Sequence, residues 1–265
     1  IKIGITTTVM QCLNCKLIYS NPQPIPNDIQ DHYGIAPKDY WNKDYILNQQ
    51  NYFNFTFDRL SKIMLIKNGM KSLDIGAGMG NSMIAQQKLG FDVYGLEPSD
   101  TFYQEAINKS GIRPERLQHA SIETAIYPPE TFDYITFDAV YEHLHNPNES
   151  LKKALSWLKP NGILHIEVPS SDWIISKFLN FYFLIIGTDY VTNISPMHPP
   201  FHLYEFGLTS FQENAKTNNY EILFSEYRTC NTFMPKLIEW ILTAYMKKTN
   251  TGMQLAVWLR KKGNK

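Results

Sequence analysis

The sequence predicts an α/β fold with a doubly wound sheet of mostly parallel strands. From Lys71 onward, short apolar runs alternate with helix-length segments, which is the pattern of consecutive βαβ units. A loop with three glycines follows the first apolar run, at the position where such folds bind ligands. The length of 265 residues suffices for one large domain with a small appendage.

The elements of this domain follow from apolar runs and their breakers. The first five strands are expected at Ser72–Ile75, Asp92–Leu96, Leu117–Ala120, Tyr134–Phe137 and Ile163–Val168. The helices between them are expected at Asn81–Leu89, Asp100–Lys109 and Glu149–Leu158. Pro160 and Gly162 are expected to stop the last helix and turn the chain. Two further strands, Glu221–Arg228 and Met253–Arg260, close the sheet as a hairpin-like pair around a helix at Pro235–Lys248.

Two smaller segments precede this domain, which we place at residues 68–265. Residues 1–26 predict a short β-type element that prolines end, and residues 27–67 predict a helical cap with apolar side chains at helical spacing. The opening residues show neither an initiator Met nor a signal-peptide pattern, so we expect a truncated or processed start.

Composition narrows the classes of partner and compartment. Lys plus Arg equals Asp plus Glu at 25 each, so no global positive field favours a nucleic-acid partner, and we expect none. Three cysteines fit a reducing compartment, which predicts a cytoplasmic protein. The apolar run at 173–187 is shorter than the roughly 20 residues of a spanning helix. We interpret it as a buried or lid helix, with a membrane-surface segment as the alternative and no stable membrane insertion.

The glycine loop reads Asp74-x-Gly76-x-Gly78-x-Gly80 and has an acidic partner in Glu97, which closes the next predicted strand. An acidic side chain there accepts the ribose hydroxyls of an adenosine. A dinucleotide-binding loop requires Gly-x-Gly-x-x-Gly, whereas position 81 is Asn. A carboxylate ahead of the glycines suits a cationic amino-acid end better than a pyrophosphate. A plain tight turn is the alternative to a binding loop.

Four segments resemble the motifs of class I S-adenosylmethionine-dependent methyltransferases. They are Leu73–Gly80, Gly95–Ser99, Phe132–Leu144 with the following Asn146-Pro147, and Leu158–Leu164. The third is similar to the fourth-strand motif of the branch that usually reads Asp-Val-Leu-Glu-His, and the fourth to a corner that usually reads Leu-Lys-Pro-Gly-Gly. The resemblance implies a Rossmann-like sheet of seven strands, mostly parallel with one antiparallel strand, behind a short N-terminal extension and a helical cap.

The resemblance also implies S-adenosylmethionine as the cofactor. It assigns the glycines to the methionine and ribose portion, Glu97 to the ribose hydroxyls, and the end of the fourth strand to the cofactor's surroundings. The adenine is expected near Ser121, where the family often has Asp; a hydroxyl also accepts a hydrogen bond. The implied cofactor residues are Asp74, Gly76, Gly78, Gly80, Glu97, Pro98, Ser121, Ile122, Asp138 and Ala139.

Two histidines are the candidates for catalysis. Methyl transfer from a sulfonium needs a donor and an acceptor held in line, and a hydroxyl acceptor benefits from a nearby base. His143 follows the predicted fourth strand, with a structural hydrogen bond as the alternative role. His202 lies in a segment that resembles the Pro-x-His-Leu-x-x-Phe segment over the acceptor site of the same branch. His145 and His198 are expected to be loop or solvent residues.

The pair Cys12-x-x-Cys15 resembles the second half of a zinc ribbon found ahead of some of these enzymes. Structural zinc needs four ligands, and Cys230 is far away in sequence, so we expect a remnant without metal. The expected partner is a small-molecule, sugar or lipid-linked acceptor, and the sequence sets no oligomeric state. An inactive methyltransferase-like binding module, and after it an NAD-dependent oxidoreductase, are the alternatives.

Overall fold

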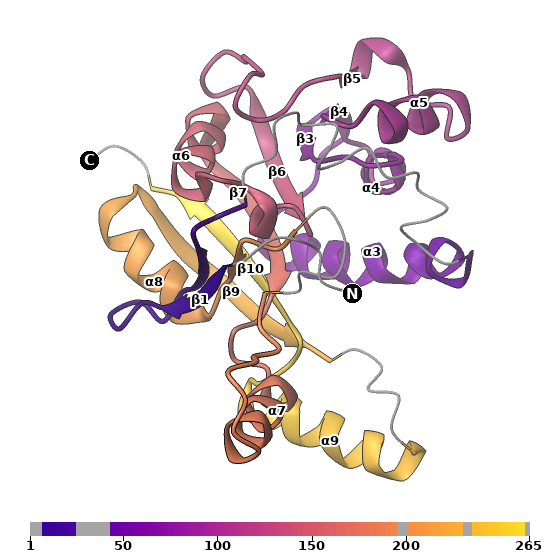
Figure 1. Ribbon diagram of the computed structural model, residues 1–265. Coiled ribbons are helices and arrows are strands. Elements are labelled where there is room, and N and C mark those ends of the chain that lie inside the picture. Colours follow the sequence, from indigo (N-terminus) through magenta and orange to yellow (C-terminus); the bar gives the residue numbers. More distant parts are fainter. Residues whose placement is uncertain (1–6, 25–42, 195–200, 230–234, 263–265) are drawn as a thin grey trace. The chain divides into compact units, whose positions relative to one another are not determined.

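The computed structural model describes residues 7–24, 43–194, 201–229 and 235–262 (Figure 1). The chain divides into two compact units. Unit 1 comprises Ile1–Ile25, Ala139–Pro147 and Ile166–Trp258, and unit 2 comprises Pro26–Asp138, Asn148–His165 and Leu259–Lys265. A seven-stranded sheet has the order β5-β4-β3-β6-β7-β10-β9, and a three-stranded sheet has the order β1-β2-β8.

Unit 2 contains the first half of the large sheet. Its complete strands are β3 (Lys71–Ile75), β4 (Asp92–Leu96), β5 (Leu117–Gln118) and β6 (Phe132–Asp138). Its helical elements are α3 (Lys43–Ile63), α4 (Asn81–Lys88), α5 (Asp100–Asn108), the short η1 (Pro114–Arg116) and all but the first residue of α6 (Pro147–Trp157). Strand β3 pairs in parallel with both β4 and β6, so the carboxyl ends of three strands share one edge.

The core of unit 2 explains why these segments become parallel strands. Leu73, Leu96, Ile135 and Phe137 are fully buried, and Ile75 is 2 % exposed. A strand covered on both faces is expected to bury apolar side chains on either side, and the central residues of β3 and β6 do so, with polar residues such as Lys71 and Asp138 at the ends. The loops at the carboxyl edge therefore start from a rigid, buried frame.

Unit 1 contains the N-terminal hairpin and most of the C-terminal third of the chain. The hairpin consists of β1 (Thr8–Gln11) and β2 (Ile18–Asn21), and β2 pairs antiparallel with β8 (Tyr204–Glu205). The other elements are η2 (Tyr141–His143), α7 (Ile174–Ile185), α8 (Leu208–Thr217), β9 (Tyr220–Arg228) and α9 (Lys236–Thr249). Strands β7 (Leu158–Pro169) and β10 (Gln254–Lys261) have residues in both units.

The predicted fold class is confirmed: the sheet is seven-stranded and mostly parallel, with one antiparallel strand pair. The short β-type element predicted at the start of the chain is present as β1 and β2, which pair antiparallel. The expected turn at Pro160 to Gly162 is also present: α6 ends at Trp157, Asn161 takes a left-handed φ of 64°, and a Cβ added at Gly162 would lie 2.7 Å from the Leu158 side chain. One expectation was wrong in part: the run at 173–187 forms a helix, α7, but of its residues only Ser176 is buried, so it is not a buried helix, while a lid or membrane-surface role stays a prediction.

The proposed boundaries at residues 26 and 67 stay predictions, because residues 25–42 lie outside the described part of the chain. The opening Ile1 to Ile5, His198 and Cys230 also lie outside the described residues, so the expectations about them stay predictions. Among the residues that the structure describes, no helix is long and apolar enough to cross a membrane.

The cysteine pair lies in the loop between β1 and β2. Cys12 N–H donates to the Leu17 carbonyl at 2.9 Å, and Lys16 N–H donates to the Cys12 carbonyl at 3.0 Å. Backbone N–H donation from Cys15, together with the Cys15 thiol and the Asn14 N–H, lowers the pKa of the Cys12 thiol. The loop is thus closed by backbone hydrogen bonds, and the expectation that it holds no metal stays a prediction.

We expect the purified chain to carry far less than one zinc per molecule at the cysteine pair, because two thiolates fill half of a tetrahedral shell. Elemental analysis by mass spectrometry measures it, with the Cys12→Ser/Cys15→Ser variant as control. One tightly held zinc that the double variant loses would contradict this expectation.

Candidate functional site

The glycine loop joins β3 to α4 through backbone conformations that exclude most side chains. Gly78 and Gly80 have left-handed φ values of 55° and 81°. A Cβ added at Gly80 would lie 2.6 Å from the Ile112 side chain. Residues other than glycine are strained at such φ values, so the loop keeps its backbone open to a ligand directly before the amino end of α4.

Asp74 is a buried carboxyl group at the end of β3. It is 2 % exposed, and its Oδ2 has no hydrogen-bond partner among the described residues. Burial raises the pKa of Asp74 to about 8, and the negative charges of Asp138 and Glu97 add to the shift, while a hydrogen bond from Ser82 offsets part of it. A buried carboxylate without a counter-charge is costly by itself and fits a cationic ligand group.

Glu97 directly follows β4 and holds the glycine loop to the next helix. Its Oε2 accepts the Gly78 N–H at 2.7 Å, and its Oε1 accepts the Ser99 N–H at 2.8 Å. Ser99 in turn caps α5 by accepting the Phe102 N–H at 3.3 Å. Burial raises the pKa of Glu97 to about 7, and the two backbone donors lower it. An ionised carboxylate has about four acceptor positions, so two remain for ribose hydroxyls.

The other cofactor residues implied by the resemblance belong to unit 2, on loops and at the end of β6, except for Ala139. The Pro98 carbonyl is 3.1 Å from His119 Nε2, Ser121 Oγ is 3.4 Å from Thr124 Oγ1, and Ile122 is buried. Asp138 ends β6 and raises the pKa of Asp74 through its charge. Ala139 begins the next segment of unit 1, with a left-handed φ of 55°.

A second group of polar side chains, in unit 1, brings together the two candidate histidines. Their rings lie 4.9 Å apart, edge to face. Together with Glu142, they place one potential ligand atom each within 4.8 Å of one another. Glu142 and His143 are buried, at 1 % and 4 % exposed, whereas His202 is partly exposed.

Two hydrogen bonds join the segments that carry these residues. His143 Nδ1 lies 3.0 Å from the Phe201 carbonyl, so the carbonyl accepts from Nδ1–H and the neutral ring keeps its lone pair on Nε2. The Leu203 N–H donates to the Glu142 carbonyl at 2.9 Å. Both bonds flank His202, and β2 pairs with β8 just after it, which fixes the backbone of His202 on either side.

A carboxylate and two imidazoles also form a donor set that zinc and non-haem iron accept. The expectation that the chain holds no metal stays a prediction. Sequence reasoning treated His143 and His202 separately and left out Glu142, because residues about 60 positions apart show no periodicity that joins them. His145 uses its backbone carbonyl to accept the Tyr204 hydroxyl at 3.0 Å.

A family model described as a methyltransferase domain matches residues 48–245. The chain belongs to this methyltransferase family. Its cofactor is S-adenosylmethionine, and it is an enzyme of the class that the resemblance implied. The oxidoreductase alternative is thereby set aside. The buried, uncompensated Asp74 and the open glycine loop fit the amino-acid end of this methyl donor.

Curated relatives carry methyltransferase names, and a solved structure shares the fold. The ubiquinone biosynthesis O-methyltransferase of Rhodopseudomonas palustris (strain HaA2) is 27% identical over 178 residues, 62% of this chain and 68% of that protein. The mitochondrial protein of the same name from Schizosaccharomyces pombe is 30% identical over 143 residues, 51% and 52% of the two chains. In fold, the chain resembles a putative sarcosine dimethylglycine methyltransferase from Galdieria sulphuraria, with a TM-score of 0.57 at 13% identity, covering 88% and 93% of the chains.

We expect cofactor affinity to rise with pH between about pH 6 and 8.5, because the buried carboxyls with pKa values near 7 and 8 must ionise to pair with an ammonium and ribose hydroxyls. Calorimetric titration with S-adenosylhomocysteine across this range measures it. Asp74→Asn should lower affinity at least tenfold and remove the upper part of the rise, whereas Glu123→Gln, on an exposed loop, should change neither. A flat profile for the parent protein would contradict the assignment.

The same burial predicts a stability effect of opposite sign. Because the folded-state pKa of Asp74 is raised above its ordinary value of 3.8, ionisation costs stability that grows from about pH 4 to about pH 8. Asp74→Asn should therefore stabilise the ligand-free protein, on the order of 1–3 kcal/mol near pH 8 and less near pH 5. Thermal unfolding at the two pH values tests this; a loss of stability at pH 8 would show that the carboxylate has a compensating partner.

Glu97→Ala should weaken cofactor binding by about 1.5–3 kcal/mol, the scale of hydrogen bonds to a charged group. Because Glu97 also holds Gly78 and Ser99, we expect faster amide exchange at both residues, measured by nuclear magnetic resonance. Unchanged cofactor affinity would show that Glu97 only supports the loop.

Proposed function

We propose that the enzyme methylates a hydroxyl oxygen of a small molecule, with Asp74 and Glu97 holding the cofactor and His202 accepting the proton. The observation that carries the catalytic part is the His143–His202 pair, in which a buried imidazole is fixed by a carbonyl and its neighbour is partly exposed. A partly exposed imidazole can be reached by an acceptor, whereas a buried one is suited to positioning. We therefore assign the proton to His202 and the positioning role to His143.

The relatives support an oxygen acceptor and a small-molecule substrate. Those matched over more than half of the chain are named O-methyltransferases of ubiquinone biosynthesis. Identities of 26–27% support the reaction class and leave the acceptor itself to be found by experiment. A sugar or lipid-linked hydroxyl stays within the proposed class, and a cytoplasmic site of action remains part of the proposal.

The proposed chemistry makes modest demands on the protein. When bound, the cofactor would supply an activated methyl group on a sulfonium, whose carbon an acceptor oxygen can attack in line while the carbon–sulfur bond breaks and the neutral thioether leaves. Asp74 then pairs with the cofactor's ammonium and Glu97 accepts its ribose hydroxyls. His202 takes the hydroxyl proton on a ring nitrogen as the new carbon–oxygen bond forms, which spares the oxygen a full positive charge.

We expect His202→Ala to slow turnover by roughly 10²–10⁴-fold while leaving S-adenosylhomocysteine affinity within about twofold of the parent, because a base acts on the acceptor alone. His202→Gln should not restore the rate, since an amide donates and accepts hydrogen bonds but takes no proton. The assay uses methyl-labelled cofactor with a panel of phenols, catechols and sugars to find an acceptor. A Gln variant as fast as the parent would make His202 an orienting residue.

A matched control separates positioning from proton transfer. His143→Asn keeps an N–H at the position of Nδ1 that can donate to the Phe201 carbonyl, and it should retain more activity than His143→Ala. If both His143 variants lost turnover fully while His202→Ala did not, the two roles would be exchanged.

A further inference from the structure

Helices α7 and α9 carry an unusual amount of exposed apolar surface. On α7, Phe178, Phe181 and Leu184 are 65, 61 and 71 % exposed; on α9, Leu237, Trp240 and Ile241 are 71, 69 and 53 % exposed. Scattered single apolar residues are normal on a protein surface, but contiguous groups of this kind mark an interaction site. We call these six side chains and the helix faces that bear them the apolar patch.

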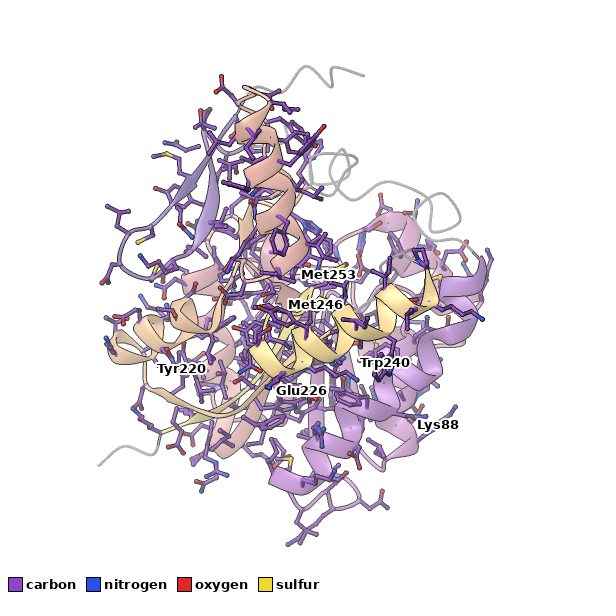
Figure 2. All side chains as sticks on the ribbon, turned by 90° about the horizontal axis from the view of Figure 1, so that it is seen from below. Lys88, Tyr220, Glu226, Trp240, Met246 and Met253 are labelled. Atoms are coloured by element: carbon purple, nitrogen blue, oxygen red, sulfur yellow. The ribbon has the colours of Figure 1, made fainter. Side chains whose placement is uncertain are left out.

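The two helices belong to the same unit and meet at one end. The Ile174 N–H, at the start of α7, donates to the Thr251 carbonyl just after α9 at 3.2 Å, and the Ser170 N–H donates to the Met253 carbonyl at 2.8 Å. Figure 1 shows the helices next to each other, and Figure 2 shows Trp240 and Met246 on α9. Met246 is 1 % exposed and Trp240 is 69 % exposed, so α9 has one buried and one exposed face.

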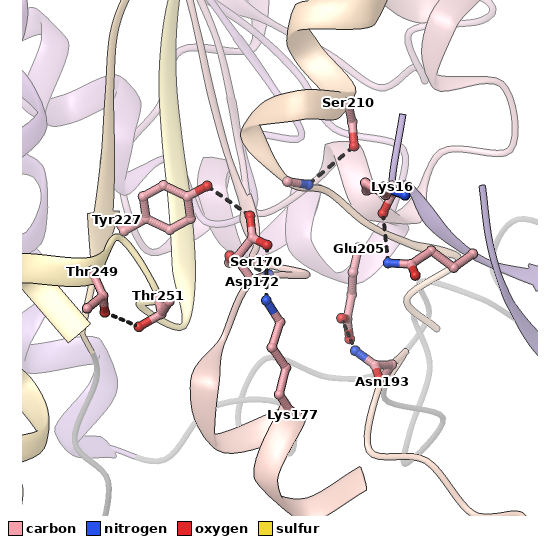
Figure 3. Close-up of polar contacts among 12 residues, drawn as sticks. Lys16, Ser170, Asp172, Lys177, Asn193, Glu205, Ser210, Tyr227, Thr249 and Thr251 are labelled. Atoms are coloured by element: carbon pink, nitrogen blue, oxygen red, sulfur yellow. Dashed lines mark hydrogen bonds and ion pairs between the residues drawn. The ribbon is translucent and has the colours of Figure 1, made fainter. Parts of the chain in front are cut away.

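Polar contacts anchor the base of α7 and the segment that follows it (Figure 3). Asp172 accepts from the Tyr227 hydroxyl at 3.0 Å and pairs with Lys177 at 3.2 Å. Asn193, after the helix, donates to the buried Glu205 at 2.6 Å. The polar side chains around α7 are therefore used for attachment, and the exposed surface that remains is apolar.

The width of the exposed faces argues against a single partner helix. At about 100° per residue, the exposed apolar positions of α7 from 178 to 186 span roughly 220° of the helix, and those of α9 from 237 to 245 span roughly 160°. A helix that packs on one partner needs a stripe of about 100°. A helix that lies partly within an apolar medium can bury a wider apolar arc than a helix that packs on one partner.

Charge around the apolar patch favours an anionic medium. The α9 segment, residues 235–249, carries three lysines, Lys236, Lys247 and Lys248, against Glu239, a net charge of +2 in a chain of net charge zero; on α7, Lys177 is paired with Asp172. Lys236 lies at one end of α9 and Lys247 and Lys248 at the other, all exposed. Lysines that flank an apolar face place their ammonium groups among lipid headgroups while aromatic side chains enter the interface.

We propose that the apolar patch docks the enzyme on the surface of a bilayer that contains anionic lipid. Binding is peripheral: the apolar faces of α7 and α9 enter the headgroup region, and the lysines contact anionic headgroups. A second copy of the chain is the less suitable occupant, because two patches of the same positive charge repel each other. This proposal is independent of the acceptor and of the histidine pair.

Co-sedimentation of the purified chain with vesicles tests the proposal. We expect binding to vesicles of phosphatidylcholine with 30% phosphatidylglycerol (about one lipid in three), at least tenfold tighter than to phosphatidylcholine alone at low salt. Phe181→Asp/Trp240→Asp should abolish binding to both vesicles, and Lys247→Glu/Lys248→Glu should remove the preference for anionic lipid. The matched controls are Ile126→Asp, at an isolated apolar side chain that is 84 % exposed, and Lys88→Glu, at an exposed lysine of another helix (Figure 2).

Three outcomes would overturn the proposal. The first is a parent protein that binds neither vesicle. The second is binding that Phe181→Asp/Trp240→Asp leaves unchanged, or that the controls reduce as much. The third is a dimer of the parent protein, measured by analytical ultracentrifugation without lipid, that does not bind vesicles. If Trp240→Asp dissociated this dimer, the apolar patch would be the contact with a second copy.

Discussion

The two hydrogen bonds that Glu97 accepts from Gly78 and Ser99 hold the cofactor loop in its shape. One carboxylate at the end of β4 joins the loop after β3 to the amino end of α5, so three elements depend on its position. Each of these hydrogen bonds is charge-assisted when Glu97 is ionised. Burial of the carboxylate strengthens both bonds, and the same burial raises the free-energy cost of ionising Glu97. The carboxylate that orders the loop is therefore the same group that we propose accepts hydrogen bonds from the ribose hydroxyls.

Asp74 shows the other side of this balance. Its burial beside Asp138 and Glu97 places several acidic groups at one sheet edge and costs the ligand-free protein stability. Enzymes commonly accept such costs where a ligand later supplies the missing charge. We attribute the arrangement to the cationic end of the methyl donor, since nothing else among the described residues neutralises Asp74 Oδ2.

The sequence predicts most of the cofactor half of the molecule because the signals there are local. The apolar runs predict the bounds of β3 and β4 to within one residue. Gly80 adopts a left-handed φ, which favours glycine, and the spacing of the glycine loop already indicates this position. The histidine pair is not local: His143 and His202 meet through hydrogen bonds between distant segments, and the pairing of β2 with β8 supports them from the N-terminal hairpin. The prediction that the run at 173–187 is buried failed for a related reason. An apolar run is expected to be buried, and only the fold shows that little of the described chain covers α7.

Recognition of the cofactor's ammonium by Asp74 is the central claim, and one calorimetric comparison tests it. The parent chain and Asp74→Asn are each titrated with S-adenosylhomocysteine, with 5′-methylthioadenosine, which lacks the amino-acid end, and with NAD. We expect the parent to bind S-adenosylhomocysteine one to one, at least tenfold more tightly than 5′-methylthioadenosine, and not to bind NAD; the tenfold preference should largely vanish in Asp74→Asn. A preference that survives the substitution, or binding of NAD alone, would contradict the account.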